Sequence, residues 1–158
     1  MTGGVNLSIH ERKLGDPDLD QLVAAAVAEL NRRYRQPGEP DDEYDLAEDA
    51  VCLVAHVDGE PAGCIAREPV TEPGWSGCAE MKRVFVHERF RGLGVASALV
   101  AAFEDAARAD GFTRVRLETG TKQPEAVALY EKLGYERSAT PFGPWADSPL
   151  SICCTKSL

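Results

Sequence analysis

The stretch from residue 84 to residue 103, VFVHERFRGLGVASALVAAF, constrains the fold of this chain more than any other. A β-branched run leads through a short charged segment to Gly92 and Gly94, and apolar residues at helical spacing follow. This order predicts a strand, a glycine loop and a helix whose first backbone N–H groups have no partner within the helix. Such a helix N-terminus favours an anionic ligand, and phosphate groups are typical of it.

Local charge indicates which anion fits. Lys82, Arg83, Arg89 and Arg91 surround the loop in a chain whose formal net charge is −9. A group of cations beside free helix N–H groups suits a pyrophosphate better than a neutral ligand. The segment therefore predicts a diphosphate site.

Two common phosphate loops fit this segment poorly. A dinucleotide fingerprint has a third glycine where Ser97 stands, and its strand runs directly into the first glycine, whereas residues 87–91 intervene here. A nucleotide-binding P-loop requires Lys-Ser or Lys-Thr after the glycines, and neither follows Gly94. The sequence thus favours neither of these folds.

Composition narrows the class of protein. The chain has 158 residues, 44% of them hydrophobic, which predicts a single domain over residues 1–158. Its acidic charge argues against nucleic-acid and anionic-membrane partners, and no apolar run approaches the roughly 20 residues of a membrane span. Five cysteines without a CxxC pair predict neither disulfides nor a metal site. We expect a reduced, cytoplasmic monomer or homodimer.

Alternation and helical spacing predict a mixed sheet with helices on its faces, an α/β fold. Asp16 or Asp18 is expected to cap the first helix. The expected strands are residues 5–12, 51–57, 62–67, 78–86, 113–119, 135–139 and 150–155, and the expected helices are residues 19–30, 95–110 and 125–133.

Two segments resemble a known family. Arg91-Gly-Leu-Gly-Val-Ala96 is similar to the R/Q-x-x-G-x-G/A signature of the GNAT N-acetyltransferase superfamily, and Cys78–Val86 resembles the strand that precedes it there. Gln123 to Tyr135 resembles the family's N-x-x-A-x-x-L-Y-x-x-x-G-F/Y segment, with Gln for Asn and Tyr for Phe. The resemblance implies a mostly antiparallel sheet of about seven strands flanked by about four helices.

The resemblance also implies acetyl-coenzyme A as co-substrate, without a metal. Its pyrophosphate would contact the N–H groups of Arg91 to Ala96 and the Ser97 hydroxyl. The end of the preceding strand would separate from residues 113–119, leaving backbone groups for the amide-rich pantetheine arm. Gln123 would contact that arm in place of the usual Asn. The implied cofactor contacts are Val84, Phe85, Val86, Arg91, Gly92, Leu93, Gly94, Val95, Ala96, Ser97, Gln123 and Tyr130.

Acetyl transfer to an amine requires removal of a proton from the amine and a proton for the departing thiolate. Glu80, on the strand before the loop, is a candidate base, and an ordinary ion pair with Lys82 or an arginine is the alternative. Glu118 is a second candidate, and a water relay is a third. Tyr130 matches the position at which the family carries its general acid; a core aromatic is the alternative.

The acceptor is expected to be a small-molecule primary amine, such as an amino acid, polyamine or aminated metabolite. No cysteine has a histidine arranged to activate it, so direct attack in a ternary complex is expected. A protein or peptide N-acetyltransferase and a non-catalytic acyl-coenzyme A-binding module are the alternatives. Candidate acceptor contacts are Tyr34, Asp41–Asp49, Phe142–Asp147 and, for a carboxylate, Arg32, Arg33 and Arg35.

Overall fold

The computed structural model describes residues 5–34, 46–143 and 146–158. They form a seven-stranded sheet in the order β1-β2-β3-β4-β5-β7-β6. The β4–β5 pair is parallel, and β1–β2, β2–β3, β5–β7 and β6–β7 are antiparallel. The elements are β1 (Leu7–Arg12), α1 (Pro17–Tyr34), β2 (Val51–Val57), β3 (Glu60–Pro69), β4 (Cys78–Val86), the 3-10 turn η1 (Glu88–Phe90), α2 (Val95–Ala109), β5 (Arg114–Gly120), α3 (Pro124–Lys132), β6 (Glu136–Arg137) and β7 (Ser151–Ser157).

The mixed seven-stranded α/β sheet expected from the sequence is confirmed. The helix count differs, because the described ranges hold three α-helices and one 3-10 turn where about four helices were expected. β6 is also shorter than the predicted strand 135–139. Ser138 still donates its N–H to the carbonyl of Cys153 on β7 at 2.8 Å, but its hydroxyl donates to the carbonyl of Thr140 at 2.8 Å in a turn that follows the strand.

The described residues divide into two compact units. The first comprises the described part of the chain up to Arg67 together with Arg83–Phe103, and the second comprises Glu68–Lys82 and Glu104–Leu158. β4 and α2 each contribute residues to both units. Each unit is described by itself below.

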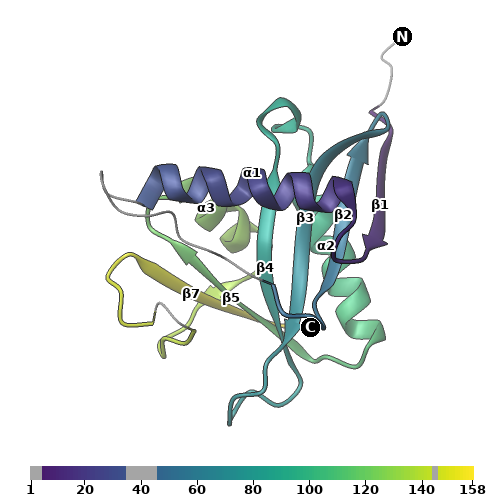
Figure 1. Ribbon diagram of the computed structural model, residues 1–158. Helices are drawn as coiled ribbons and strands as arrows, with labels where there is room; N and C mark the ends of the chain where they lie inside the picture. The colour runs from purple at the N-terminus through teal and green to yellow at the C-terminus, as the bar shows by residue number, and fades with distance from the viewer. Residues whose placement is uncertain (1–4, 35–45, 144–145) are drawn as a thin grey trace. The chain divides into compact units, whose positions relative to one another are not determined.

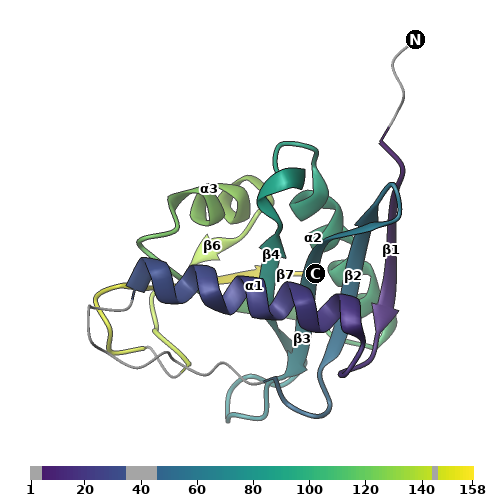
Figure 2. The same ribbon diagram turned by 45° about the horizontal axis from the view of Figure 1, so that its top comes forward.

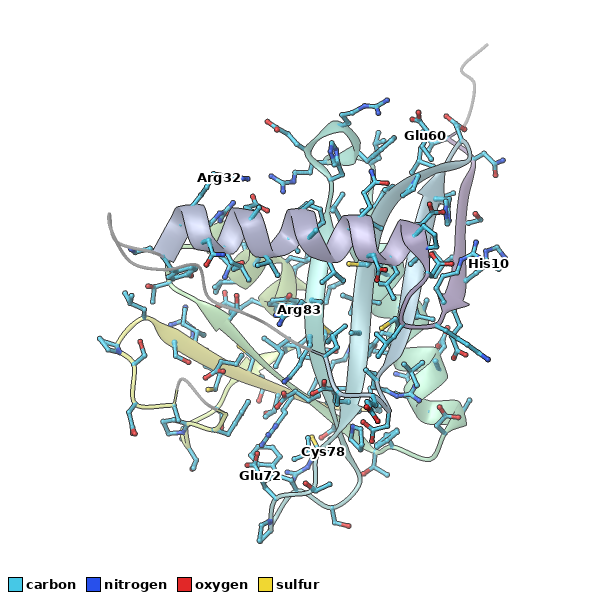
Figure 3. The ribbon with its side chains drawn as sticks, in the orientation of Figure 1. His10, Arg32, Glu60, Glu72, Cys78 and Arg83 are labelled. Atoms are coloured by element: carbon cyan, nitrogen blue, oxygen red, sulfur yellow. The ribbon has the colours of Figure 1, made fainter. Side chains whose placement is uncertain are left out.

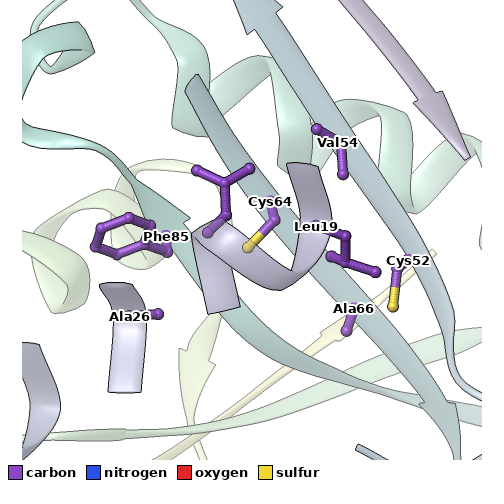
Figure 4. Packing of buried hydrophobic residues seen from close by; sticks show 8 residues of the cluster. Leu19, Ala26, Cys52, Val54, Cys64, Ala66 and Phe85 are labelled. Carbon is purple, nitrogen blue, oxygen red and sulfur yellow. The ribbon is translucent and has the colours of Figure 1, made fainter. Parts of the chain in front are cut away.

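In the first unit α1 packs across β2 and β3 (Figure 1). Asp16 caps this helix, because its Oδ1 accepts the backbone N–H groups of Asp18 at 3.0 Å and Leu19 at 3.1 Å. The apolar side of α1 then packs onto the sheet in one buried cluster (Figure 4). Its members are Leu19, Leu22, Ala26, Cys52, Val54, Cys64, Ala66 and Phe85.

The start of α2 covers the opposite face of β3 (Figure 2), at a position that only glycine fits. A Cβ atom on Gly63 would lie 2.7 Å from the carbonyl oxygen of Phe85 and 3.1 Å from a methyl group of Leu99. The missing side chain therefore lets β3 approach both β4 and α2 closely, which fixes the helix that follows the glycine loop.

The second unit is centred on β5. This strand pairs with β4 from Cys78↔Arg114 to Met81↔Leu117, and with β7 along its whole length. Glu104 of α2 is buried beside this sheet, where its carboxylate accepts hydrogen bonds from the Tyr135 hydroxyl at 2.8 Å and from Lys156 Nζ at 3.0 Å. Lys156 also donates to the carbonyl of Leu133 at the end of α3, at 2.8 Å. A single buried carboxylate thus connects α2, α3 and β7.

Candidate active site

The glycine loop has the backbone geometry of an anion site. Gly92 and Gly94 have φ values of 82° and 80°, which only glycine adopts readily, and a Cβ atom on either would meet nothing within 4 Å. The N–H of Ala98 donates to the carbonyl of Gly94 at 3.1 Å and closes the first turn of α2. The N–H groups of residues 95–97 precede this bond and therefore have no intrahelical acceptor. The loop thus leaves room for an anion next to backbone N–H groups that are available as hydrogen-bond donors.

Arg91 is engaged within the protein. Its N–H donates to the carbonyl of Glu88 at 3.4 Å, its Nε to the carbonyl of Val86 at 2.9 Å, and its guanidinium to the carboxylate of Glu29 at 3.0 Å. Arg89 pairs with Glu60 at 3.1 Å in the same way. Because both cations are paired, an anion here would depend mainly on the backbone N–H groups from Gly92 onward.

The end of β4 that precedes this loop lies outside the register that β4 shares with β5. That register ends at Met81, whereas β4 continues to Val86. Arg83, just beyond the register, has a φ of 56°, a left-handed conformation that non-glycine residues adopt only at a cost. Phe85 is buried, so its side chain is not open to a ligand. Of the expected contacts Val84–Val86, the carbonyl of Val86 already accepts Arg91.

Glu80 forms ion pairs with both cations that flank it in the second unit. Its Oε1 lies 2.7 Å from Arg116 Nε and its Oε2 lies 3.3 Å from Lys82 Nζ. Lys82 also pairs with Glu68 at 3.0 Å. Burial alone would lower the pKa of Lys82, but its two carboxylate partners raise it above the ordinary value, so Lys82 stays charged. The ion pair that the sequence allowed for Glu80 is therefore present.

An open cavity of about 370 Å³ lies beside Glu80, entirely within the second unit. Its lining carries the carboxylates of Glu68, Glu72 and Glu80 and the cations of Lys82 and Arg116, so carboxylates outnumber cations. The other lining residues are Pro69, Val70, Thr71 and Gly143. Sequence reasoning identified neither Arg116 nor Glu72, because residues distant along the chain give no local signal of their pairing.

Tyr130 lies on α3 and is buried, with 6% of its surface exposed. Its ring packs edge-on against Tyr135, with 6.0 Å between centroids. Burial raises the pKa of the Tyr130 phenol above its ordinary value, so the hydroxyl keeps its proton at neutral and moderately alkaline pH. Tyr130 therefore has the buried position expected of a core aromatic residue and also the protonated hydroxyl that a general acid requires.

The other predicted site residues are distributed over both units. Glu118 accepts a hydrogen bond from the Ser151 hydroxyl at 2.9 Å. Gln123 is the N-cap of α3. Phe142 is buried against Trp75, with ring centroids 5.0 Å apart. Arg32 and Tyr34 lie at the end of α1, and Arg33 pairs with Glu29 at 3.0 Å. Arg35, Trp145 and residues 41–45 of the acidic segment lie outside the described residues.

Comparison with known proteins decides the family. The model of the Acetyltransferase (GNAT) family matches residues 23–135. The chain belongs to the GNAT acetyltransferase family. It is therefore an N-acetyltransferase with acetyl-coenzyme A as its co-substrate.

This GNAT protein has relatives of similar length and fold. It is 36% identical over 146 residues to an IAA acetyltransferase of Azospirillum brasilense, covering 89% of this chain and 93% of that one. A Klebsiella pneumoniae structure described as an acyl-CoA N-acyltransferase aligns with a TM-score of 0.77 and 30% identity, over 96% of this chain and 97% of that one. An Elizabethkingia anophelis GNAT acetyltransferase with acetyl-CoA bound aligns at 0.70 and 20%, over 97% and 99%. The match spans 38% to 42% of three longer vertebrate relatives.

The described residues contain neither a candidate membrane span nor a candidate metal-binding group. Among them no helix has the length and apolar character needed to cross a membrane. No group of three or more His, Cys, Asp or Glu side chains within the described ranges is placed to hold a metal ion.

Proposed function

We propose that this GNAT acetyltransferase acetylates the primary amine of a small molecule, by direct attack of the amine on the thioester of acetyl-coenzyme A. The observation that carries the proposal is the cavity beside Glu80. Its volume of about 370 Å³ is in the range of small-molecule sites, and its excess of carboxylates favours a protonated amine. A protein substrate would require a groove for an extended peptide instead.

The glycine loop suits acetyl-coenzyme A, the acetyl donor. Gly92 and Gly94 leave open space at their Cβ positions, and the N–H groups at the start of α2 are donors for a pyrophosphate. The Ser97 hydroxyl is expected to add one donor there. Because Arg91 is held by Glu29 and the carbonyl of Val86, its guanidinium would reach a phosphate only after releasing Glu29.

The proposed chemistry requires two proton transfers. The bound donor supplies an activated acetyl group; the amine nitrogen bonds to its carbonyl carbon, and the carbon–sulfur bond breaks. Tyr130 is the proposed proton donor to the departing thiolate. Both oxygens of Glu80 are paired with cations, so its proposed role is to accept the amine's proton through a water molecule, with Glu118 as the alternative.

The test is release of free thiol from acetyl-coenzyme A in the presence of amines, amino acids and peptides. Turnover with small amines and not with peptides supports the proposal, and the reverse pattern supports a peptide acetyltransferase. Heat stabilisation by coenzyme A without turnover on any acceptor would support the non-catalytic binding module.

The protein's own thiols should not disturb this assay. All five cysteines are free and buried, and burial raises the pKa of the Cys64 thiol to about 12. Since the thiolate is the reactive form, we expect almost no reaction of native protein with a disulfide reagent during the assay, and five thiols after denaturation. Rapid labelling of native protein would show that a cysteine is more accessible than its burial indicates.

Substitution of Gly94 by alanine should weaken coenzyme A binding by about tenfold. The added methyl group would enter the open space of the loop and strain a backbone φ of 80°. Isothermal calorimetry with coenzyme A measures the effect. The matched control is Gly111→Ala, which imposes the same strain at a φ of 89° in open space but at the end of α2. Equal weakening in both variants would contradict a pyrophosphate contact at the loop.

A further inference from the structure

Arg116 occupies an unusual position for a cation. Its side chain is only 4% exposed, and its guanidinium carbon lies 4.7 Å from the centroid of Trp75 and 4.6 Å from that of Phe142, two rings that themselves pack edge-on with 5.0 Å between centroids. The two rings pack along one side of the guanidinium and restrict its orientation, and its edge is left for hydrogen bonds. The rings thus orient a rigid pair of donors, and Arg116 lines the cavity beside Glu80.

Two carboxylates take up the donors of Arg116. Glu80, on the neighbouring strand β4, accepts from Nε at 2.7 Å. Glu72 accepts from both terminal nitrogens, at 3.1 Å and 2.7 Å, in the two-bond geometry by which arginine recognises a carboxylate. The terminal nitrogens of Arg116 are therefore arranged for a planar carboxylate, and in this structure Glu72 provides it.

Glu72 differs from Glu80 in how firmly it is held. It lies on the loop between β3 and β4 (Figure 3), and 52% of its side chain is exposed, against 12% for Glu80. The hydrogen bond from Arg116 lowers the pKa of Glu72, so this carboxylate stays ionised at neutral pH. A carboxylate that is 52% exposed on a surface loop gains little net free energy from an ion pair, because water competes for its oxygens. Glu72 is thus the replaceable partner.

We propose that Arg116 is the anchor for a carboxylate on the acceptor, and that Glu72 fills this position until the acceptor displaces it. The exchange replaces one carboxylate by another, so the charge at the guanidinium does not change. The proposal rests on the proposed function and narrows it: the preferred acceptor is an amine that carries a carboxylate, as an amino acid does. The remaining carboxylates, Glu68 and Glu80, favour its ammonium group.

The experiment compares paired probes: phenylalanine with phenethylamine, and leucine with isoamylamine, where the second of each pair lacks the carboxylate. Wild type, Glu72→Gln and Arg116→Lys are assayed for thiol release with each probe. Glu72→Gln should lower the KM for the amino acids about three- to tenfold, because the competing carboxylate is gone. Arg116→Lys should raise it about tenfold, because a lysine cannot form two parallel bonds. Each change should alter the KM of the simple amine less than that of the amino acid of the same pair, because the simple amine has no carboxylate for Arg116 to bind.

Comparison of variants with the same probe cancels the different basicity of the two amines. The matched control is Glu131→Gln, because Glu131 is also 52% exposed and pairs with an arginine, Arg137, at 3.4 Å outside the cavity. It should leave the KM of every probe unchanged. Thermal unfolding of each variant shows whether it is folded. If Arg116→Lys does not fold, the Glu72→Gln variant still tests the proposal.

A second measurement does not depend on turnover. Trp75 stacks on Arg116, so displacement of Glu72 should change its fluorescence, and a Trp145→Phe background removes the signal of the other tryptophan. Titration with phenylalanine should change the emission, and phenethylamine should not.

Equal KM changes for both members of a pair, or no KM change in Glu72→Gln, would overturn the role of Arg116 while leaving the acetyltransferase assignment intact. Failure of every amine to release thiol would instead contradict the proposed function. The fluorescence titration would then decide on the carboxylate site alone: an emission change specific to phenylalanine supports it, and no change overturns it.

Discussion

Substitution of Tyr130 by phenylalanine should lower kcat by about 10- to 100-fold and leave the affinity for acetyl-coenzyme A nearly unchanged. The change removes one hydroxyl and keeps the buried ring that packs on Tyr135. Burial raises the pKa of the Tyr130 phenol, so the wild-type group remains protonated as pH rises from 7 to 9 and remains able to donate. Steady-state kinetics gives kcat, and calorimetry with coenzyme A gives the affinity.

Tyr135→Phe is the matched control for this prediction. Its ring lies beside that of Tyr130, but its hydroxyl donates to Glu104 at 2.8 Å. Loss of that bond should cost about 1 kcal/mol of the free energy of unfolding and leave kcat unchanged. If Tyr130→Phe turned over at the wild-type rate, Tyr130 would be a core residue without a catalytic role.

Substitution of Glu104 by alanine should lower the free energy of unfolding by about 3 kcal/mol. It removes the carboxylate that accepts both Tyr135 and Lys156, and leaves the hydroxyl and ammonium groups in a largely buried place. The value lies at the lower end for a broken buried pair, because 24% of the Lys156 side chain is exposed and water can partly replace the carboxylate.

Thermal and urea-induced unfolding measure this effect, with an expected fall in Tm of about 6–12 °C. Asp105→Ala is the control, since the neighbouring Asp105 is 82% exposed and forms only a surface pair with Arg108. Its unfolding free energy should change by less than about 0.5 kcal/mol. Similar losses in both variants would show that the buried network contributes nothing beyond a surface ion pair.

Local patterns predicted most of the secondary structure. Leu19, Leu22 and Ala26 recur at helical spacing in the sequence and form the buried side of α1. The strand–glycine–helix order around Gly92 and Gly94 was also readable, because positive φ values at a helix start favour glycine strongly. The short β6 was overestimated because the turn at Ser138 depends on a side-chain bond that apolar alternation does not reveal.

The ion-pair partners of charged residues could not be predicted from local sequence patterns. The sequence predicted that Arg91 lies beside the phosphates of the cofactor. The structure instead pairs its guanidinium with Glu29 on α1, which is 62 residues away in the sequence. It offered Glu80 either as a base or as an ion pair with a neighbouring cation, and the structure shows the pairs with Lys82 and Arg116. A charged residue does not indicate from the sequence which distant residue it will pair with. Its partner is known only once the register of the strands is known.

The sequence by itself therefore determined the order of the elements, the glycine loop and the resemblance to the GNAT superfamily, because these depend on backbone preferences and spacing over a few residues. Only the tertiary structure decided which carboxylates meet which cations, and it alone revealed Arg116 packed against Trp75 and Phe142 with its terminal nitrogens bound to Glu72. The physical reason is that the parallel pairing of β4 with β5 sets Glu80 opposite Arg116, although the two residues are remote in the sequence.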